Sequence, residues 1–258
     1  MKRGPKRGHF SRSRGLDDFN ERFSQHIVQK HIKKALSQQK IVRVLEIGCG
    51  EGRVLMELRK LFPTIELHGI NKEPWPAMKG SQSLKKTAIA YKIFKAQELK
   101  GISLPEIHFY DARQLRFPDN YFDLVISQVS IHYVARKDLL LEEVWRVLKP
   151  QGKALLNIDG RSENLPDFMD FETPRFVIYK NNKVYPLRKL IGEVRKKGYG
   201  LRYIKQKTRV NLTMIRNTDK KLKLSLAFDE LSSFNLNVLN EEKDNWKIYF
   251  GYRSVYRI

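Results

Sequence analysis

The chain has 258 residues, 41% of them hydrophobic, which is enough for one sizeable core or for one core with a small appendage. Its single cysteine, Cys49, excludes an internal disulfide and a multi-cysteine zinc site and favours a reducing, cytoplasmic compartment. Fifty Lys and Arg against 28 Asp and Glu give a net charge of +22, which indicates either a polyanionic partner or a proteome in which every chain is rich in lysine.

Two classes of interaction are not expected. No apolar stretch approaches the roughly 18 residues of a membrane span, and no apolar segment follows the basic N-terminus as in a secretory signal. The six histidines are scattered without the spacing of metal ligands. We therefore expect neither membrane contact nor a metal site.

Residues 1–15 contain six Lys or Arg and no acid, so we expect a flexible basic arm. From Asp17 to about Ser37, apolar residues recur at near-helical spacing. We expect residues 16–258 to form a single domain, because no linker long enough to separate two domains is present.

Strand-like and helical segments then alternate, which predicts parallel strands joined by right-handed crossovers. The expected strands are 41–48, 64–70, 106–112, 122–128 and 153–159. The expected helices are 51–61, one near 84–99 within an insert at 71–104, and 137–148.

After Gly160 the alternation changes. Asn181-Asn182 stands between two strand-like runs and predicts a hairpin. Residues 187–197 are expected to be helical, with Gly198 as the stop, and residues 201–258 to be mostly strands.

The stretch VLEIGCGEGRVL, residues 44–55, joins the first expected strand to the next helix. Glycines at this edge of a parallel sheet let the backbone turn sharply and approach a ligand closely. Gly48, Gly50 and Gly52 are spaced G-x-G-x-G, unlike the dinucleotide pattern G-x-G-x-x-G. The Lys-Ser/Thr of a phosphate loop is absent, which disfavours an NTPase.

With Glu46 two residues ahead, the pattern E-x-G-x-G-x-G resembles motif I of the class I S-adenosylmethionine-dependent methyltransferases. The segments HFYDARQL, FPDNYFDLVISQVSIHYV and EEVWRVLKPQGKALL resemble the family's later segments, in the family's order, so the resemblance covers roughly residues 40–160. It implies a Rossmann-like α/β fold: a mostly parallel seven-stranded sheet with an antiparallel C-terminal strand and helices on both faces. It also implies S-adenosylmethionine as the cofactor.

The resemblance assigns cofactor binding to Glu46, Gly48, Cys49, Gly50, Gly52, Asn71, Asp111, Ala112, Ser127 and Gln128. Asn71 departs from the family, which usually carries an acid there to hold both ribose hydroxyls. An amide can still hold the ribose without charge assistance; alternatively Glu73 substitutes for it, and Asn71 is a turn residue. Asp111 either contacts the adenine amino group or caps a helix. Cys49 is expected to be a small residue facing the methionine moiety.

The sequence also limits the reaction. Methylation at carbon 5 of a pyrimidine needs a cysteine nucleophile, and the only cysteine lies in the glycine loop. The segment SQVS, residues 127–130, lacks the proline pair of adenine-N6 enzymes. His132 and Asp159 are the candidate general bases, and His132 is alternatively a packing residue.

Three basic regions are present: the arm, the insert at 71–104, and residues 188–223, which begin within a second basic insert at about 160–200. They suggest contact with phosphates, and tyrosines near the third region could stack on bases. The candidate substrate-binding residues are Lys2, Arg3, Lys6, Arg7, Lys85, Lys86, Arg195, Lys196 and Lys197. We therefore expect an RNA substrate, ribosomal RNA above all, methylated on a base nitrogen or a ribose oxygen. By analogy, such an enzyme could confer resistance to a ribosome-targeting antibiotic. The alternatives are a small-molecule methyltransferase, favoured by the segment SIHY, and a catalytically silent RNA-binding module.

Overall fold

A computed structural model describes residues 14–72, 81–128, 130–131, 134, 137–157, 177–180, 183–206 and 209–224. Several residues singled out from the sequence lie outside this part of the chain. They are Lys2, Arg3, Lys6, Arg7, Glu73, His132, Asp159, Asn181 and Asn182, together with the strands expected in 225–258.

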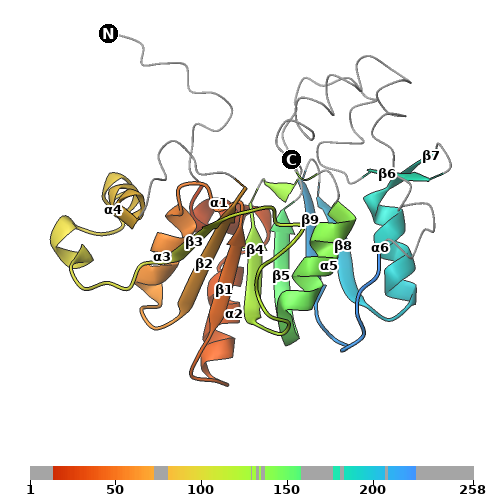
Figure 1. Cartoon of the computed structure of the whole chain (residues 1–258), viewed down its shortest axis with the longest axis horizontal. Helices are drawn as coiled ribbons and strands as arrows, with labels where there is room; N and C mark the ends of the chain where they lie inside the picture. The colour runs from red at the N-terminus through yellow and green to blue at the C-terminus, as the bar shows by residue number, and fades with distance from the viewer. Residues whose placement is uncertain are drawn as a thin grey trace, which may run out of the picture.

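The core of the fold is a seven-stranded sheet with the order β3-β2-β1-β4-β5-β9-β8 (Figure 1). Its strands are β1 (Arg43–Ile47), β2 (Glu66–Asn71), β3 (Glu106–Phe109), β4 (Phe122–Ser127), β5 (Leu148–Asn157), β8 (Gly200–Gln206) and β9 (Arg209–Ile215). The strands from β3 to β5 pair in parallel, and β9 is antiparallel to both of its neighbours, β5 and β8. This arrangement confirms the Rossmann-like class I methyltransferase fold expected from the sequence.

Helices cover both faces, as expected (Figure 1). The helices α1 (Leu16–Arg22), α2 (Ile27–Leu36) and α3 (Arg53–Leu61) contribute to one apolar cluster, and α5 (Lys137–Val147) and α6 (Leu187–Lys196) contribute to the other. Val44 belongs to the first cluster and Leu45 to the second. Successive residues of a strand point to opposite faces, so an apolar run such as VRVLEI is needed where both faces are buried.

The insert after β2 holds a shorter helix than expected. Instead of one helix near 84–99, the chain forms α4 (Ser81–Ala90) and a 3₁₀ helix, η1 (Ala96–Leu99). Lys92, between them, has φ of 55°, in the left-handed region, which ends an α-helix. Leu84 and Leu99 pack with Met56 of α3 in a small apolar cluster of their own.

The hairpin and the helix expected after residue 176 are present. Strands β6 (Val177–Lys180) and β7 (Lys183–Pro186) pair antiparallel, and α6 follows directly. Gly198 has φ of +89°, which fits its expected role as the stop of that helix.

The described N-terminal residues are docked against the domain. Gly15, which the sequence placed in the flexible arm, is buried, so the arm as predicted was too long by at least that residue. Leu16 N donates to Glu57 Oε2 of α3 at 2.6 Å, and Gln128 Nε2 donates to Gly15 O at 3.1 Å. The expected helical segment is interrupted between Arg22 and Ile27, and His26, which directly precedes α2, has φ of 57°.

Beyond residue 201 the expectation of strands is met only in part. Residues 200–206 and 209–215 form β8 and β9, whereas residues 216–224 form no strand. Within the described residues, no helix combines the length and the apolar character required to cross a bilayer.

Candidate cofactor site

The glycine loop runs from the end of β1 into α3 with three residues in the left-handed region. Gly48, Gly50 and Gly52 have φ of +71°, +54° and +73°, a conformation that favours glycine. A Cβ on Gly48 would overlap the side chain of Ser130. A Cβ on Gly50 would meet no heavy atom of the described residues within 4 Å, so this is the side from which a ligand can approach the backbone.

Asn71, at the end of β2, holds this loop in place. Its Oδ1 accepts a hydrogen bond from Gly50 N at 2.9 Å, and its Nδ2 donates to Gly50 O at 2.9 Å. The side chain is only 5% exposed. The amide thus binds both polar groups of one residue of the loop, which a carboxylate cannot do because it has no donor. Its role at the ribose stays a prediction.

Glu46, in β1, is buried beneath the loop. Its Oε2 has no hydrogen-bond partner among the described residues. Burial raises the pKa of this carboxyl well above its usual range, and the nearby charge of Glu57 raises it further.

A second acceptor lies just after the neighbouring strand. Gln128 Oε1 is buried without a partner among the described residues, while its Nε2 is bound to Gly15 O. Glu46 pairs with Ile126 of β4, so the two side chains come from adjacent strands at the carboxyl edge. Two buried acceptors without donors, beside a bare loop, suit a ligand that brings hydrogen-bond donors. The ammonium of the methionine moiety of S-adenosylmethionine is such a group, so the residues present fit the expected cofactor.

Ser127 acts inside the protein. Its Oγ donates to Ile47 O at 2.9 Å and lies 2.7 Å from Ser130 Oγ, which also reaches Ile47 O at 2.9 Å. The two serines fasten the end of β4 to the end of β1 and limit the space at Gly48. Ser127 was a candidate from the sequence and Ser130 was not, although the S-x-x-S spacing at the end of β4 is a signal that could have indicated it.

Cys49 is a packing residue of the loop. Its Sγ lies only 2.6 Å from the position that a Cβ on Gly69 would take. The thiol therefore packs against β2 at a place where only glycine leaves enough room. Burial raises the pKa of the thiol well above its usual range, and the charge of Glu46 adds to the effect. A protonated, buried thiol is a poor nucleophile, which supports the small-residue role expected for it.

Asp111 follows β3 in a turn rather than a helix, so the helix-cap alternative was wrong. Its carboxylate accepts from Arg113 N at 2.9 Å and from the guanidinium, with Nη2 at 2.7 Å from Oδ2. Burial opposes ionisation, but the hydrogen bonds from Arg113 outweigh it and lower the pKa of Asp111. Ala112 packs against the α5-side core. Contact of either residue with adenine stays a prediction.

The described basic residues proposed to bind substrate are not gathered around the loop. Lys85 and Lys86 lie on α4, at the β3 end of the sheet, and α6 lies at the β8 end (Figure 1). Residues 195–197 lie at the end of α6, just before β8 begins at Gly200. Gly200 pairs with Ile215, which also pairs with Lys153, near the start of the part of β5 that pairs with β4. They therefore lie at the amino edge of the sheet, opposite the edge that carries the loop.

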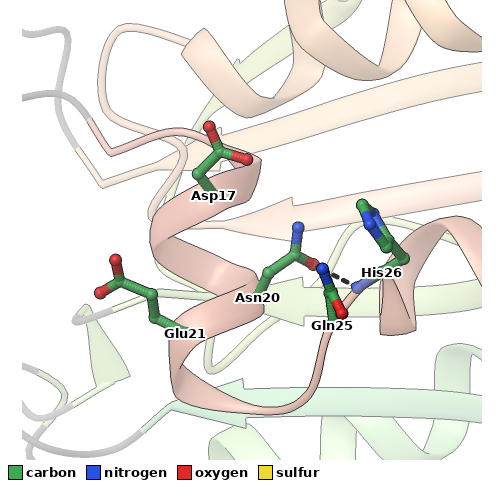
Figure 2. A pocket seen from close by; sticks show the side chains of 5 residues that line it. All are labelled: Asp17, Asn20, Glu21, Gln25 and His26. Atoms are coloured by element: carbon green, nitrogen blue, oxygen red, sulfur yellow. Dashed lines mark hydrogen bonds between the residues drawn. The ribbon is translucent and has the colours of Figure 1, made fainter.

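A groove of about 330 Å³ lies on α1 and the segment that joins it to α2. Figure 2 shows its lining residues, Asp17, Asn20, Glu21, Gln25 and His26. Within it Asn20 Oδ1 accepts from His26 N at 3.0 Å. None of these five residues belongs to the glycine loop, and we do not assign the cofactor to this groove.

Residues 45–156 match the family model described as a methyltransferase domain. The match spans β1 to β5 and so includes the loop, Asn71, Asp111 and Gln128. It confirms S-adenosylmethionine as the cofactor expected from the sequence.

Curated relatives are similar over shorter stretches. The chain is 27% identical over 126 residues to a sterol 4-C-methyltransferase of Caenorhabditis elegans, covering 49% of this chain and 34% of that protein. It is 41% identical over 73 residues to a ubiquinone/menaquinone biosynthesis C-methyltransferase of Chromobacterium violaceum, covering 28% and 30%. The chain thus spans about a third of the length of the relatives it matches.

Among solved structures, a methyltransferase of Methanosarcina mazei described as SAM-dependent is 20% identical. The alignment covers 69% of this chain and 92% of that chain, with a TM-score of 0.43. A second, from Methanococcus maripaludis, is 14% identical with a TM-score of 0.46, covering 86% of this chain and all of that one. The fold assignment comes from the strand order and pairing, independently of these similarities.

Proposed function

We propose that the chain is an S-adenosylmethionine-dependent methyltransferase that acts on a small organic molecule. The observation that carries this proposal is the methyltransferase-domain match over a loop whose bare face and open acceptors fit the cofactor. In this proposal the loop backbone at Gly50 lies against the cofactor, and Glu46 and Gln128 accept hydrogen bonds from its ammonium.

The bound cofactor supplies a methyl group on a positively charged sulfur, and an electron pair of the acceptor forms the new bond while the carbon–sulfur pair leaves with the sulfur. What the protein contributes to such a displacement is chiefly alignment of the two reactants. The Asn71 clamp and the two serines fix the loop before any ligand binds, so little ordering remains to be done on binding. A carbon acceptor that loses a proton would also need a base, for which His132 and Asp159 remain the candidates.

The acceptor class rests on the relatives. The curated relatives named above are carbon methyltransferases of sterols and of ubiquinone or menaquinone biosynthesis. A 24% identical sterol 24-C-methyltransferase of Aspergillus fumigatus, aligned over 144 residues, gives the same indication. We therefore propose an apolar acceptor with a nucleophilic carbon. This replaces the RNA substrate favoured by the sequence with the alternative that the sequence left open.

RNA remains a second candidate because of one observation, the net charge of +22. The relatives named here give no support to ribosomal RNA methylation or to antibiotic resistance. The location of residues 195–197 at the far edge of the sheet also takes Arg195, Lys196 and Lys197 away from the cofactor side. The cytoplasmic location expected from the sequence stays a prediction.

One experiment separates these possibilities. Purified full-length protein receives methyl-labelled S-adenosylmethionine with a demethylated quinone precursor, a sterol or naive ribosomal RNA. Label in the solvent-extracted product supports the proposal, whereas acid-precipitable label released by ribonuclease overturns it in favour of RNA. Cofactor binding without label in any acceptor, together with salt-sensitive RNA binding, would favour the silent RNA-binding module. The Gly50→Arg variant, run in parallel, shows whether any transfer depends on the loop.

A further inference from the structure

A cluster of three potential metal ligands lies on strands β2 and β3, away from the glycine loop. His68 of β2 is in register with Glu106 of β3, and His108 follows two residues later on the same strand. Ile70, two residues after His68, packs in the same apolar cluster as the residues of α5. Because side chains alternate along a strand, His68, Glu106 and His108 lie on this same face of the sheet.

The three ligand atoms form a compact triangle. His68 Nδ1 lies 3.4 Å from His108 Nε2 and 3.4 Å from Glu106 Oε2, and His108 Nε2 lies 3.8 Å from the same carboxylate oxygen. These separations are long for hydrogen bonds, which centre on about 2.9 Å. They match a shared ion, because two atoms bound tetrahedrally at about 2.1 Å lie about 3.4 Å apart.

Of the three side chains, His68 is buried among aromatic rings, whereas His108 and Glu106 are accessible to solvent. The His68 side chain is 7% exposed, against 31% for His108 and 69% for Glu106. The rings of Phe117, Tyr121 and Phe122 contact the His68 ring edge-on and restrict it. His68 Nε2 is buried and has no hydrogen-bond partner in the described part of the chain.

We propose that His68, Glu106 and His108 bind a divalent transition-metal ion of the zinc type, with water in a fourth position. Two nitrogens and one oxygen suit such an ion better than Mg²⁺ or Ca²⁺, which prefer oxygen ligands. The spacing of the histidines in the sequence did not predict this site, because His68 and Glu106 are 38 residues apart and only the pairing of β2 with β3 brings the ligands together.

The proposed ion would join the edge strand β3 to β2. His68 precedes Asn71 by three residues, and His108 precedes Asp111 by three, a distance of about 10 Å along a strand. The ion would therefore fix the relative position of the two strands that present those residues. This role does not depend on which molecule is methylated, nor on the chain being an enzyme.

The test uses full-length protein freed of metal with a chelator and titrated with Co²⁺, followed by competition with Zn²⁺. The expected result is one equivalent of Co²⁺ with the intense visible absorption of a four-coordinate site, which Zn²⁺ abolishes. Zn²⁺ should also raise the midpoint of thermal unfolding, because a ligand that binds only the folded chain stabilises it.

Glu106→Gln and His108→Gln replace the two more exposed ligands, so loss of the fold is not expected. Each should weaken Co²⁺ binding by about tenfold or more and remove the thermal shift. His26→Asn is the matched control, since it removes a histidine elsewhere at a φ of 57° that asparagine tolerates, and it should bind as the unaltered protein does. Absence of binding, a weak six-coordinate spectrum, or binding unchanged in both ligand variants would overturn the proposal.

Discussion

The two sides of the candidate cofactor site differ in whether their polar side chains already have hydrogen-bond partners within the protein. On the loop side, Glu46 Oε2 and Gln128 Oε1 are buried acceptors without donors in the described residues. On the side predicted to hold the nucleoside, here called the nucleoside side, Asn71 is bound to Gly50 and Asp111 to Arg113. A group without a partner gains a whole hydrogen bond when a ligand arrives, whereas a bonded group must exchange one. The loop side should therefore provide most of the binding energy.

Among the substitutions proposed here at Glu46, Asn71 and Arg113, Glu46→Gln should have the largest effect on cofactor affinity. The substitution keeps an acceptor but removes the carboxylate that would pair with a ligand ammonium, so cofactor affinity should fall by about 10- to 100-fold, the equivalent of a charged hydrogen bond. Calorimetric titration measures the loss. Glu51→Gln, the same change within the loop region, should bind normally, and an equal loss there would show that Glu46 has no special role.

The difference in stability between the unaltered protein and the Glu46→Gln variant should also depend on pH. Because burial raises the folded-state pKa of Glu46, the folded protein holds a proton that the unfolded chain releases near pH 4.3. The contribution of Glu46 to stability is fully present below that pH and is lost as the pH rises towards the folded-state pKa. The stability of the unaltered protein relative to Glu46→Gln should therefore decline from about pH 4.3 upwards, as measured by denaturant unfolding at several pH values. A difference that does not change with pH would contradict the assignment.

Asn71→Asp tests the two hydrogen bonds between Asn71 and Gly50 on the nucleoside side. The carboxylate can accept from Gly50 N but cannot donate to Gly50 O, so the clamp should lose about 1–3 kcal/mol of stability. Cofactor affinity should fall by about tenfold as the loop loosens. Urea unfolding and calorimetry give the two values, with Asn120→Asp as a control in an exposed turn. Tighter cofactor binding by the variant would show that the ribose, and not the loop, is the main partner of this position.

The smallest expected effect is that of Arg113→Ala. Removing the guanidinium frees Asp111 from its ion pair, so a nucleoside that needs this carboxylate should bind about two- to fivefold more tightly, the value of a part-exposed pair. A titration with adenosine and with S-adenosylmethionine measures the change, and Arg116→Ala serves as the neighbouring control. Weaker binding in the variant would mean that Asp111 is needed in its paired state.

The parts of the fold that the sequence predicted are those with local signals. Apolar runs that are buried on both faces predicted the positions of the parallel strands along the chain, and Gly48, Gly50 and Gly52 at alternate positions predicted a turn that only glycine adopts readily. Asn181-Asn182 gave the hairpin of β6 and β7. Each of these signals lies within a dozen residues of the element that it predicts.

The remaining features depend on contacts between distant residues. Gln128 binds Gly15, which is 113 positions away, and this contact is one of those that dock the N-terminal segment. The side chain of Asn71 could be assigned to a ribose or to a turn, and only the approach of Gly50 shows what it binds inside the protein. The basic residues near 195 looked suitable for a substrate site until the direction of α6 placed them at the opposite edge of the sheet.

We propose that the cofactor approaches the open side of Gly50, and a paired titration of two glycine variants tests this directly. Gly50 and Gly101 both have positive φ, +54° and +77°, and a Cβ on either would meet no described heavy atom within 4 Å. Gly50→Arg and Gly101→Arg should therefore carry similar strain and the same added charge. Calorimetry with S-adenosylmethionine should show normal binding to the unaltered protein and to Gly101→Arg, and none to folded Gly50→Arg. Unchanged binding to a folded Gly50→Arg would contradict the account.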